Sequence, residues 1–449
     1  MSDRDAPCLP GFRYVLADSI SFLNPVDWDA VVARSGTFLS RAFLVLMEEH
    51  LPANLTTHYA LVYRGSTPLV AVVGQSLEIH VADLPAGLMA REGTGWWRSV
   101  RAATGQSFAR AQRRILIFDR PTPEAALREM WPEVASELWH RVWKTAEQVA
   151  EASVGWIHQR FLVCGNLLSW GPHGVAFAAG EDPARLWPAV VEALDRIQRS
   201  SAVLGDSDLM MVKDLTDEQP EAGPALHHCG FSRFETEPNM VFQPDPSWAD
   251  FADYLKALKS DYRSGIRHTF EALERAGITL ECLRPEQVQD MTSEIQALYR
   301  QVHDRQKLRL VDIQPGWIPA LALRFRDDFR TIAARPRGGG PLQGFISLIR
   351  DGDGALGYYV GFNKAAAAQG VPLYLGLFYS ALGQGIEMGA RRISLGRTAL
   401  GPKAQVGAKA QAMHGFLRHR NTALNLAVPS VLALLPAPRQ APGRAPFRS

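Results

Sequence analysis

A glycine-punctuated segment in the second half of the chain carries the residues best suited to binding an anionic substrate. Residues 394–409, SLGRTALGPKAQVGAK, follow a short predicted strand, and glycines divide them into turns. Substrates gather at strand ends, where loops present backbone and side-chain groups. The candidate binding residues are Gly396, Arg397, Thr398 and Lys403, which suit a phosphate-bearing donor or an anionic acceptor. The alternative is a surface connection that uses glycine only for its shape.

Candidates for acid–base chemistry lie near this segment. A nucleophile that has to lose a proton needs a base within hydrogen-bond reach, directly or through water. His303 on a predicted helix and His414 after the glycine-rich segment are the candidate bases. Tyr359 and Tyr379 are the candidate acids for protonating a leaving group. The competing interpretation is structural, because a single histidine is more often buried for packing or simply solvated.

Four cations recur on a predicted amphipathic helix between residues 247 and 277. Lys256, Lys259, Arg263 and Arg267 are three, four and four residues apart, which places them along one helix edge beside the apolar stripe. Such an edge suits the phosphates of CoA, a carrier-protein phosphopantetheine or tRNA. It is equally typical of a solvated helix face whose aliphatic stems are buried.

The elements that must position these groups begin with an ordered run in the first half. A hairpin is predicted over residues 58–81, around Arg64-Gly65-Ser66. Residues 182–200 have the period of an amphipathic helix, and 208–215, DLMMVKDL, that of a strand. A short helix then closes on Gly230, which fits the left-handed position after a helix, and a strand follows over 231–242.

The second half repeats this order of elements. Asp351-Gly352-Asp353-Gly354 is a strong hairpin signal, because such residues accept a positive φ at low cost. The predicted elements are a helix over 286–305, strands over 278–283, 329–334, 343–350 and 355–362, a helix over 373–389 and a strand over 392–395.

These patterns predict an α/β (α+β) fold of two tandem domains, each a mixed, mostly antiparallel sheet with flanking helices. The predicted boundaries are 1–244, 245–425 and a Pro-rich tail over 426–449 that is partly disordered. A tryptophan-rich stretch, residues 130–144, is predicted to form a long packed helix of the first domain.

The chain resembles the double-domain, Fem-type branch of the GNAT superfamily of acyl-CoA N-acyltransferases. The resemblance is carried by VCGNLLSWGPHGVAF at residues 163–177, the helix-Gly-Phe-strand run at 226–243, YLKALKSDYRSGIRH at 254–268 and the segment at 394–409. It implies transfer of an acyl group from a thioester to a primary amine, with no metal. The second domain is then the catalytic one, and the first shapes the acceptor site.

The same resemblance places residues 358–363, YYVGFN, on the strand that runs past the thioester and offers it backbone groups. Asn363 is therefore a candidate donor-binding residue. The stretch that follows, NKAAAAQGVP over 363–372, departs from the family's phosphate-binding loop. Only Gln369 and Gly370 resemble that loop, and Pro372 lacks a backbone donor.

Composition limits the partners. The chain has 449 residues, 48 Lys and Arg against 46 Asp and Glu, and a net charge of +2, so its bulk charge does not favour nucleic acid or an anionic membrane. Its 4 cysteines form no CxxC pair. His227-His228-Cys229 is a poor metal site because adjacent side chains diverge on a helix. We expect no DNA partner, no metal and no bound cofactor.

The sequence carries no leader-like start and no eighteen-residue apolar run, which favours a cytoplasmic location, and the resemblance implies a bacterial enzyme. Membrane contact is expected to be at most peripheral, at the inner membrane face, through the apolar residues 424–435.

The leading hypothesis is an N-acyltransferase that uses an acyl-CoA or acyl-carrier-protein thioester. The resemblance extends to enzymes of lipid metabolism that acylate a sphingoid long-chain base, as a ceramide synthase does. Two alternatives stay open: a Fem-type transferase that carries aminoacyl groups from tRNA to a cell-wall precursor, and a non-catalytic binding protein with the same fold.

Overall fold

In the computed structural model, the described residues are 11–80, 158–200, 207–304, 311–433, 435 and 437–448. The predicted tryptophan-rich helix over 130–144 lies outside them. The first half has the expected hairpin, with Gly65 at φ 59°, and the expected helix-strand-helix-strand run. Its elements are β1 (Phe12–Ala17), α1 (Pro25–Val32), α2 (Arg41–Glu49), β2 (Leu55–Arg64), β3 (Thr67–His80), β4 (His158–Cys164), β5 (Val175–Phe177), α7 (Pro183–Ser200), β6 (Leu209–Thr216), α8 (Ala222–His228) and β7 (Ser232–Phe242).

The second half repeats the order, and its hairpin turns at Gly352 with φ 61°. The predicted helix over 286–305 is divided into two helices at Met291. The elements are α9 (Phe251–Ala257), α10 (Ser260–Arg275), β8 (Ile278–Leu283), α11 (Pro285–Asp290), α12 (Thr292–His303), α13 (Trp317–Phe325), β9 (Phe329–Pro336), β10 (Gly344–Asp351), β11 (Gly354–Phe362), α14 (Lys364–Ala368), α15 (Leu373–Glu387), β12 (Ile393–Ser394), α16 (Leu400–Gln405), β13 (Lys409–His419), α17 (Thr422–Asn425) and α18 (Val428–Leu432).

The single helix predicted between residues 247 and 277 is wrong. The chain leaves the helix at Leu258, which has extended backbone angles, and starts a new helix with Lys259 as its N-cap. Lys256 therefore lies on α9, while Arg263 and Arg267 lie on α10, so the four cations do not share one continuous helix edge. The break allows the C-terminal tail to dock at this point.

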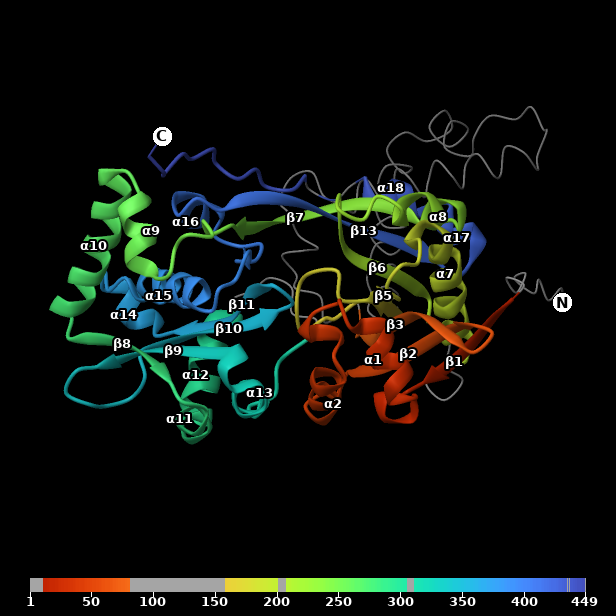
Figure 1. Ribbon diagram of the computed structural model, residues 1–449, viewed down its shortest axis with the longest axis horizontal. Coiled ribbons are helices and arrows are strands. Elements are labelled where there is room, and N and C mark those ends of the chain that lie inside the picture. The colour runs from red at the N-terminus through yellow and green to blue at the C-terminus, as the bar shows by residue number, and fades with distance from the viewer. Residues whose placement is uncertain are drawn as a thin grey trace, which may run out of the picture.

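One sheet joins both halves, in the order β1-β2-β3-β4-β6-β13-β7-β12-β11-β10-β9-β8, with β5 beside β3. The last strand of each half is exchanged: β7 pairs with β12 of the second half, and β13 pairs with β6 of the first. Figure 1 shows β7 and β13 running side by side across the junction. Neither half has a complete sheet without a strand from the other.

The hydrophobic core also crosses the junction. On one face, α1 and α2 of the first half share a buried cluster with α11, α12 and α13 of the second. Phe43 packs edge-on against Trp317, with 5.6 Å between the ring centroids. On the other face, α7 and α8 cover the first half, and α9, α10 and α15 cover the second. The shared cluster fixes the position of one half against the other.

Residues 437–448 of the C-terminal tail contact the second half of the chain. The tail returns from α18 to the second half, where Lys259 N donates to Pro446 O at 2.8 Å and Arg448 N donates to Ala257 O at 3.1 Å. The Phe447 ring lies 5.8 Å from the ring of Trp248. The tail thus spans both halves and fills the gap left by the helix break.

Candidate functional site

Two parallel strand pairs diverge at the junction of the halves, and a cavity of about 550 Å³ lies between them. In the second half, β11 and β12 pair only at Ala355–Ile393 and Leu356–Ser394 before they separate. In the first, β4 and β6 separate after Cys164–Val212. The cavity is lined from both openings, by residues 167–170 and Met211, Lys213 and Asp214 of the first half, and by residues 357–360 and 395–398 with Lys403 of the second.

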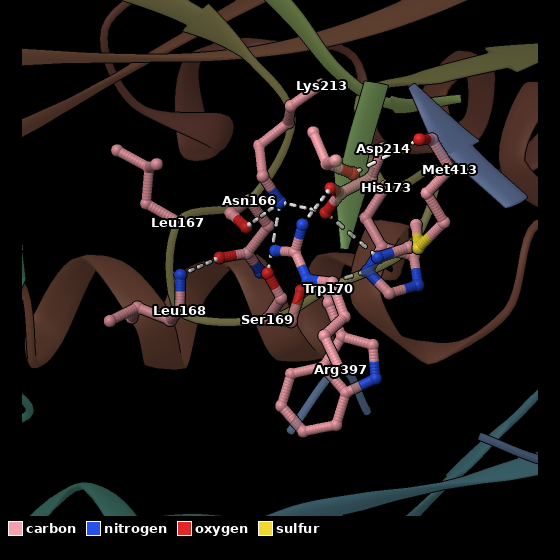
Figure 2. Close-up of polar contacts among 12 residues, drawn as sticks. Asn166, Leu167, Leu168, Ser169, Trp170, His173, Lys213, Asp214, Arg397 and Met413 are labelled. Atoms are coloured by element: carbon pink, nitrogen blue, oxygen red, sulfur yellow. Dashed lines mark hydrogen bonds and ion pairs between the residues drawn. The ribbon is translucent and has the colours of Figure 1, made fainter. Parts of the chain in front are cut away.

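A buried ion cluster joins the two openings (Figure 2). Lys213 Nζ donates to Asn166 O at 3.0 Å, to Ser169 O at 3.1 Å and to the Asp214 carboxylate. Arg397 Nη1 donates to Asp214 Oδ1 at 3.1 Å. The Asp214 side chain is only 2% exposed, whereas that of Arg397 is 31% exposed. Arg397 therefore bridges the buried cluster and the open cavity.

The ion pairs in this cluster stabilise the charged form of each partner. Burial disfavours the Asp214 carboxylate, but Lys213, Arg397 and the Gly171 N–H outweigh burial and hold its pKa below the ordinary value. Burial lowers the pKa of Lys213, although Asp214 opposes that shift. Asp214 has φ 60°, an uncommon backbone angle for a residue other than glycine. Strain of this kind is found where the surrounding contacts dictate the conformation.

The glycine-rich loop after β12 is held open by specific contacts. Asn239 Oδ1 accepts from Ser394 Oγ at 3.0 Å and from Gly396 N at 3.1 Å. Gly396 has φ 79°, and a side chain there would lie 3.1 Å from the Trp170 ring. Lys403, on α16, donates through Nζ to Gly396 O at 3.1 Å. Burial lowers the pKa of Lys403 to about 8, so its amine loses its proton much closer to physiological pH than an ordinary lysine does.

The strand predicted to run past a thioester has a bulge at the cavity. Between Ile346 and Leu348 of β10, the partner strand β11 contains one extra residue. Ser347 Oγ fills the bulge: it accepts from Tyr359 N at 3.0 Å and donates to Tyr359 O at 3.3 Å. Bulges are common beside active sites, where they redirect a strand.

Two of the four catalytic candidates line the cavity. The Tyr359 hydroxyl donates to Leu168 O at 3.0 Å, and burial raises its pKa well above 10. It is therefore a weak acid that already has a partner. His303 stacks on Tyr299 with 4.7 Å between ring centroids, and its Nε2 lies 3.8 Å from Asp312 Oδ1. His303 has the better position for proton transfer.

The other two catalytic candidates do not line it. Tyr379 lies on α15 and faces the core, where its ring lies against Phe270 and Phe378, and burial raises its pKa. His414 lies on β13 beside Arg233, with 3.4 Å between Nδ1 and Nη2. Burial and Arg233 lower the pKa of His414.

The remaining binding candidates divide in the same way. Gly396, Arg397, Thr398 and Lys403 all line the cavity. Asn363 instead caps α14, because its Oδ1 accepts from Ala365 N at 3.0 Å and Ala366 N at 3.2 Å. The structure does not bring the cations of α9 and α10 to the cavity wall, namely Lys256, Lys259, Arg263 and Arg267.

The first half supplies cavity residues that the sequence patterns did not single out. Lys213 and Asp214 were included only as part of a predicted strand, and Asn166, Ser169 and Trp170 as part of a resemblance motif. The one available signal was the adjacent charges in the otherwise apolar strand DLMMVKDL. Among the described residues, no group of three or more His, Cys, Asp or Glu side chains is arranged to hold a metal ion.

Comparison with known proteins gives one family match and several structural neighbours of low sequence identity. Residues 260–424 match the acetyltransferase (GNAT) domain family. FemX aligns with a TM-score of 0.50 at 10% identity, over 91% of this chain and 98% of its own. A tandem GNAT protein from the clavulanic acid biosynthesis pathway aligns with a TM-score of 0.44 at 11% identity, over 91% of this chain and 99% of its own. The C-terminal domain of a lysylphosphatidylglycerol synthetase from Agrobacterium fabrum aligns with 0.40 at 15% identity, over 64% and 85%. A search of curated proteins finds no significant match.

Residues 260–424 therefore form an acetyltransferase (GNAT) domain, and the whole chain shares the double-domain fold of FemX. The fold class is the predicted mixture of helices and a mostly antiparallel sheet. Within the described part of the chain, no helix has the length and apolar character needed to cross a membrane.

Proposed function

We propose that the protein transfers an acyl group from an acyl thioester to a primary amine in the cavity between its halves. The observation that carries this proposal is the position of the cavity, where β11 and β12 diverge within the acetyltransferase-like domain. Its volume of about 550 Å³ falls within the range of small-molecule sites. The thioester carbonyl would lie against the bulged part of β11.

The wall of the cavity favours an acyl chain over an acetyl group. Apolar side chains from both halves form most of it, including Met211, Leu348, Val360, Phe378 and Leu395. Burying each methylene of a chain there contributes about 0.8 kcal/mol. A lipid amine such as a sphingoid base suits the same surroundings. This supports our proposal of a role in lipid metabolism, with peripheral contact at the inner membrane face of a bacterial cell.

The polar end of the cavity suits the head of the donor. Arg397 is partly exposed there, and Lys403 lines the same cavity from α16. The connection after β11 is occupied by α14, so we assign the anionic part of a CoA or carrier-protein donor to Arg397 rather than to a phosphate loop at that point. His303 is our candidate for the base that accepts the amine proton.

The test is incubation of the purified protein with acyl-CoAs and acyl-carrier proteins of varied chain length, together with pooled primary amines that include long-chain bases. Mass spectrometry should detect an amide. Arg397→Ala should reduce its formation by at least tenfold, and Arg397→Lys should retain part of it. Arg391→Ala is the matched control, because Arg391 is 83% exposed and does not line the cavity.

Absence of an amide with every thioester, from a protein shown to be folded, would overturn this proposal. The same amine pool should then be tested with aminoacyl-tRNA and cell-wall precursors. A product there would identify the aminoacyl transferase alternative, and a negative result in both assays would leave a binding protein with a GNAT fold.

A further inference from the structure

A serine, a histidine and an aspartate form a hydrogen-bonded chain beside the cavity. Ser169 lines the cavity, and its Oγ lies 2.9 Å from His173 Nδ1. His173 Nε2 lies 3.2 Å from Asp351 Oδ2. Ser169 and His173 follow β4 in the first half, whereas Asp351 ends β10 in the second, so the chain of contacts crosses the junction. Figure 2 shows Ser169 and His173 next to the Lys213–Asp214 pair.

Two glycines make this arrangement possible. Gly36 has φ 81°, and a side chain on it would place a carbon 2.2 Å from Asp351 Oδ1. Gly171 has φ 121°, and a side chain there would lie 2.8 Å from the His173 ring. Phe38 stacks on that ring with 4.2 Å between centroids. The surroundings therefore hold both the carboxylate and the imidazole in place.

The hydrogen-bond roles follow from the chemistry of the three groups. Asp351 Oδ1 accepts from Thr37 N at 2.9 Å, which leaves Oδ2 to accept from a protonated His173 Nε2. Neutral imidazole protonated at Nε2 has its lone pair on Nδ1, where it can accept the Ser169 proton. A base oriented by a carboxylate and bonded to a hydroxyl is the arrangement that activates a serine nucleophile.

We propose that Ser169 is a catalytic nucleophile that carries the acyl group between donor and amine, a route that rests on the proposed function. In the first step Ser169 Oγ bonds to the acyl carbon and the C–S bond breaks. The hydroxyl proton passes to His173 and then to the leaving thiolate. In the second step the amine nitrogen bonds to the acyl carbon, the ester C–O bond breaks, and an amine proton returns through His173 to Ser169.

The charges nearby suit this chemistry. Lys213 holds the Ser169 carbonyl, and Arg397 bonds the same Asp214 that Lys213 bonds. Two cations therefore share one carboxylate beside the loop that carries Ser169. The excess positive charge there would favour the negative charge that develops on the acyl oxygen during the reaction. If the three residues only held the two halves together, the Ser169 hydroxyl would not need to be reactive. The two interpretations therefore predict different reactivity for Ser169.

The first experiment treats the protein with a fluorophosphonate, which reacts with activated serine hydroxyls, and locates the adduct by peptide mass spectrometry. We expect an adduct on Ser169 that Ser169→Ala abolishes and that His173→Gln and Asp351→Asn reduce by at least tenfold. Ser260→Ala is the matched control, because Ser260 is an exposed serine at the start of α10 and should leave labelling unchanged. Circular dichroism checks that each variant is folded.

The second experiment adds acyl thioesters without amine and measures the intact mass. We expect the protein to gain one acyl group, and a later addition of amine to remove it as the amide. Ser169→Cys should still gain an acyl group, because a thiol is also a nucleophile. A purely structural serine would show neither the adduct nor this rescue.

The outcomes separate the two proposals. Amide formation that continues in folded Ser169→Ala, with no acyl or phosphonyl adduct in the wild type, would overturn the nucleophile and keep the proposed function. Labelling of Ser169 without an amide from any thioester would support the nucleophile and overturn N-acyl transfer. No adduct and no amide would overturn both.

Discussion

Arg397 and Asp214, 183 residues apart in sequence, form an ion pair across the junction of the two halves, with 3.1 Å between Nη1 and Oδ1. Lys213 bonds the same carboxylate from the neighbouring position. One buried carboxylate therefore pairs with two cations that come from opposite sides of the cavity. The stability of the junction and the electrostatics of the site depend on the same side chain.

Asp214→Asn should destabilise the protein by about 3–5 kcal/mol at pH 7, because it leaves Lys213 buried without its counter-ion. The pKa of Asp214 is depressed below 3.8, so its stabilising effect is fully present above that pH. The effect is lost as the pH falls through the folded-state pKa. Urea unfolding of wild type and variant should show a constant gap from pH 7 to about 4, narrowing below it.

Glu218→Gln is the control for this measurement, because Glu218 pairs with Arg392 at 3.4 Å while 64% exposed. An exposed pair contributes about 1 kcal/mol or less. A loss in Asp214→Asn no larger than that of the control would contradict the role assigned to Asp214.

Lys403→Met should change stability in a pH-dependent manner. Burial lowers the pKa of Lys403 from 10.5 to about 8. Between these values the unfolded chain binds a proton that the folded chain does not, so wild-type stability from this group rises with pH. Below pH 8 the buried charge costs about 3 kcal/mol, which methionine avoids. The free energy of unfolding of the variant should exceed that of wild type at pH 7, and this difference should shrink toward pH 10.

Urea unfolding at several pH values measures this difference, with Lys409→Met as the control. Because Lys409 is exposed, the difference in unfolding free energy between Lys409→Met and wild type should not vary with pH. A pH-independent difference for Lys403→Met would show that Lys403 is not forced toward neutrality.

Local patterns predicted most of the elements. The hairpin of β10 and β11 follows from DGDG, and the end of α8 follows from Gly230, which has φ 82°. In both cases the backbone angle depends on residues within the turn itself. The glycine-rich segment at residues 394–409 follows a strand, as predicted, but residues 400–405 of it form α16 and not turns alone.

Long-range pairing was not readable from those patterns. The alternation along β7 and β13 indicates which side chains are buried, but it carries no information about which strand lies beside them, so the exchange between halves was missed. In the sequence, Lys213 and Asp214 are typical polar residues of a strand. Only the fold shows that Arg397 lies next to them. The break between α9 and α10 contains no Gly or Pro that could have predicted it. It depends on a contact with the C-terminal tail, which is distant in the sequence.

Phe447→Ala tests that tail contact. The Phe447 ring packs on Trp248 and Tyr254 and covers Gly407. Because the side chain is only partly buried, we expect a loss of about 2 kcal/mol, below the range for a fully buried phenylalanine. Urea unfolding measures the loss, and proteolysis should cut residues 437–448 faster in the variant. Arg444→Ala, at an exposed position of the same tail, should match wild type. Equal stability of Phe447→Ala and wild type would mean that the tail does not support the helix break.

Val360→Phe tests whether the apolar wall of the cavity sets acyl-chain length. Val360 lies on β11 beyond the point where it leaves β12, and it lines the cavity. A larger side chain there removes space from the chain but leaves the ion cluster in place. We expect kcat/KM for long acyl thioesters to fall by about 10–200-fold relative to short ones, the discrimination that one methylene gives in an apolar pocket. The measurement is a series of thioesters of increasing length with one amine. Val45→Phe adds the same bulk on α2, where Val45 is 38% exposed, and should keep the wild-type profile. An unchanged length profile in Val360→Phe would place the acyl chain elsewhere, while amide formation itself would still stand.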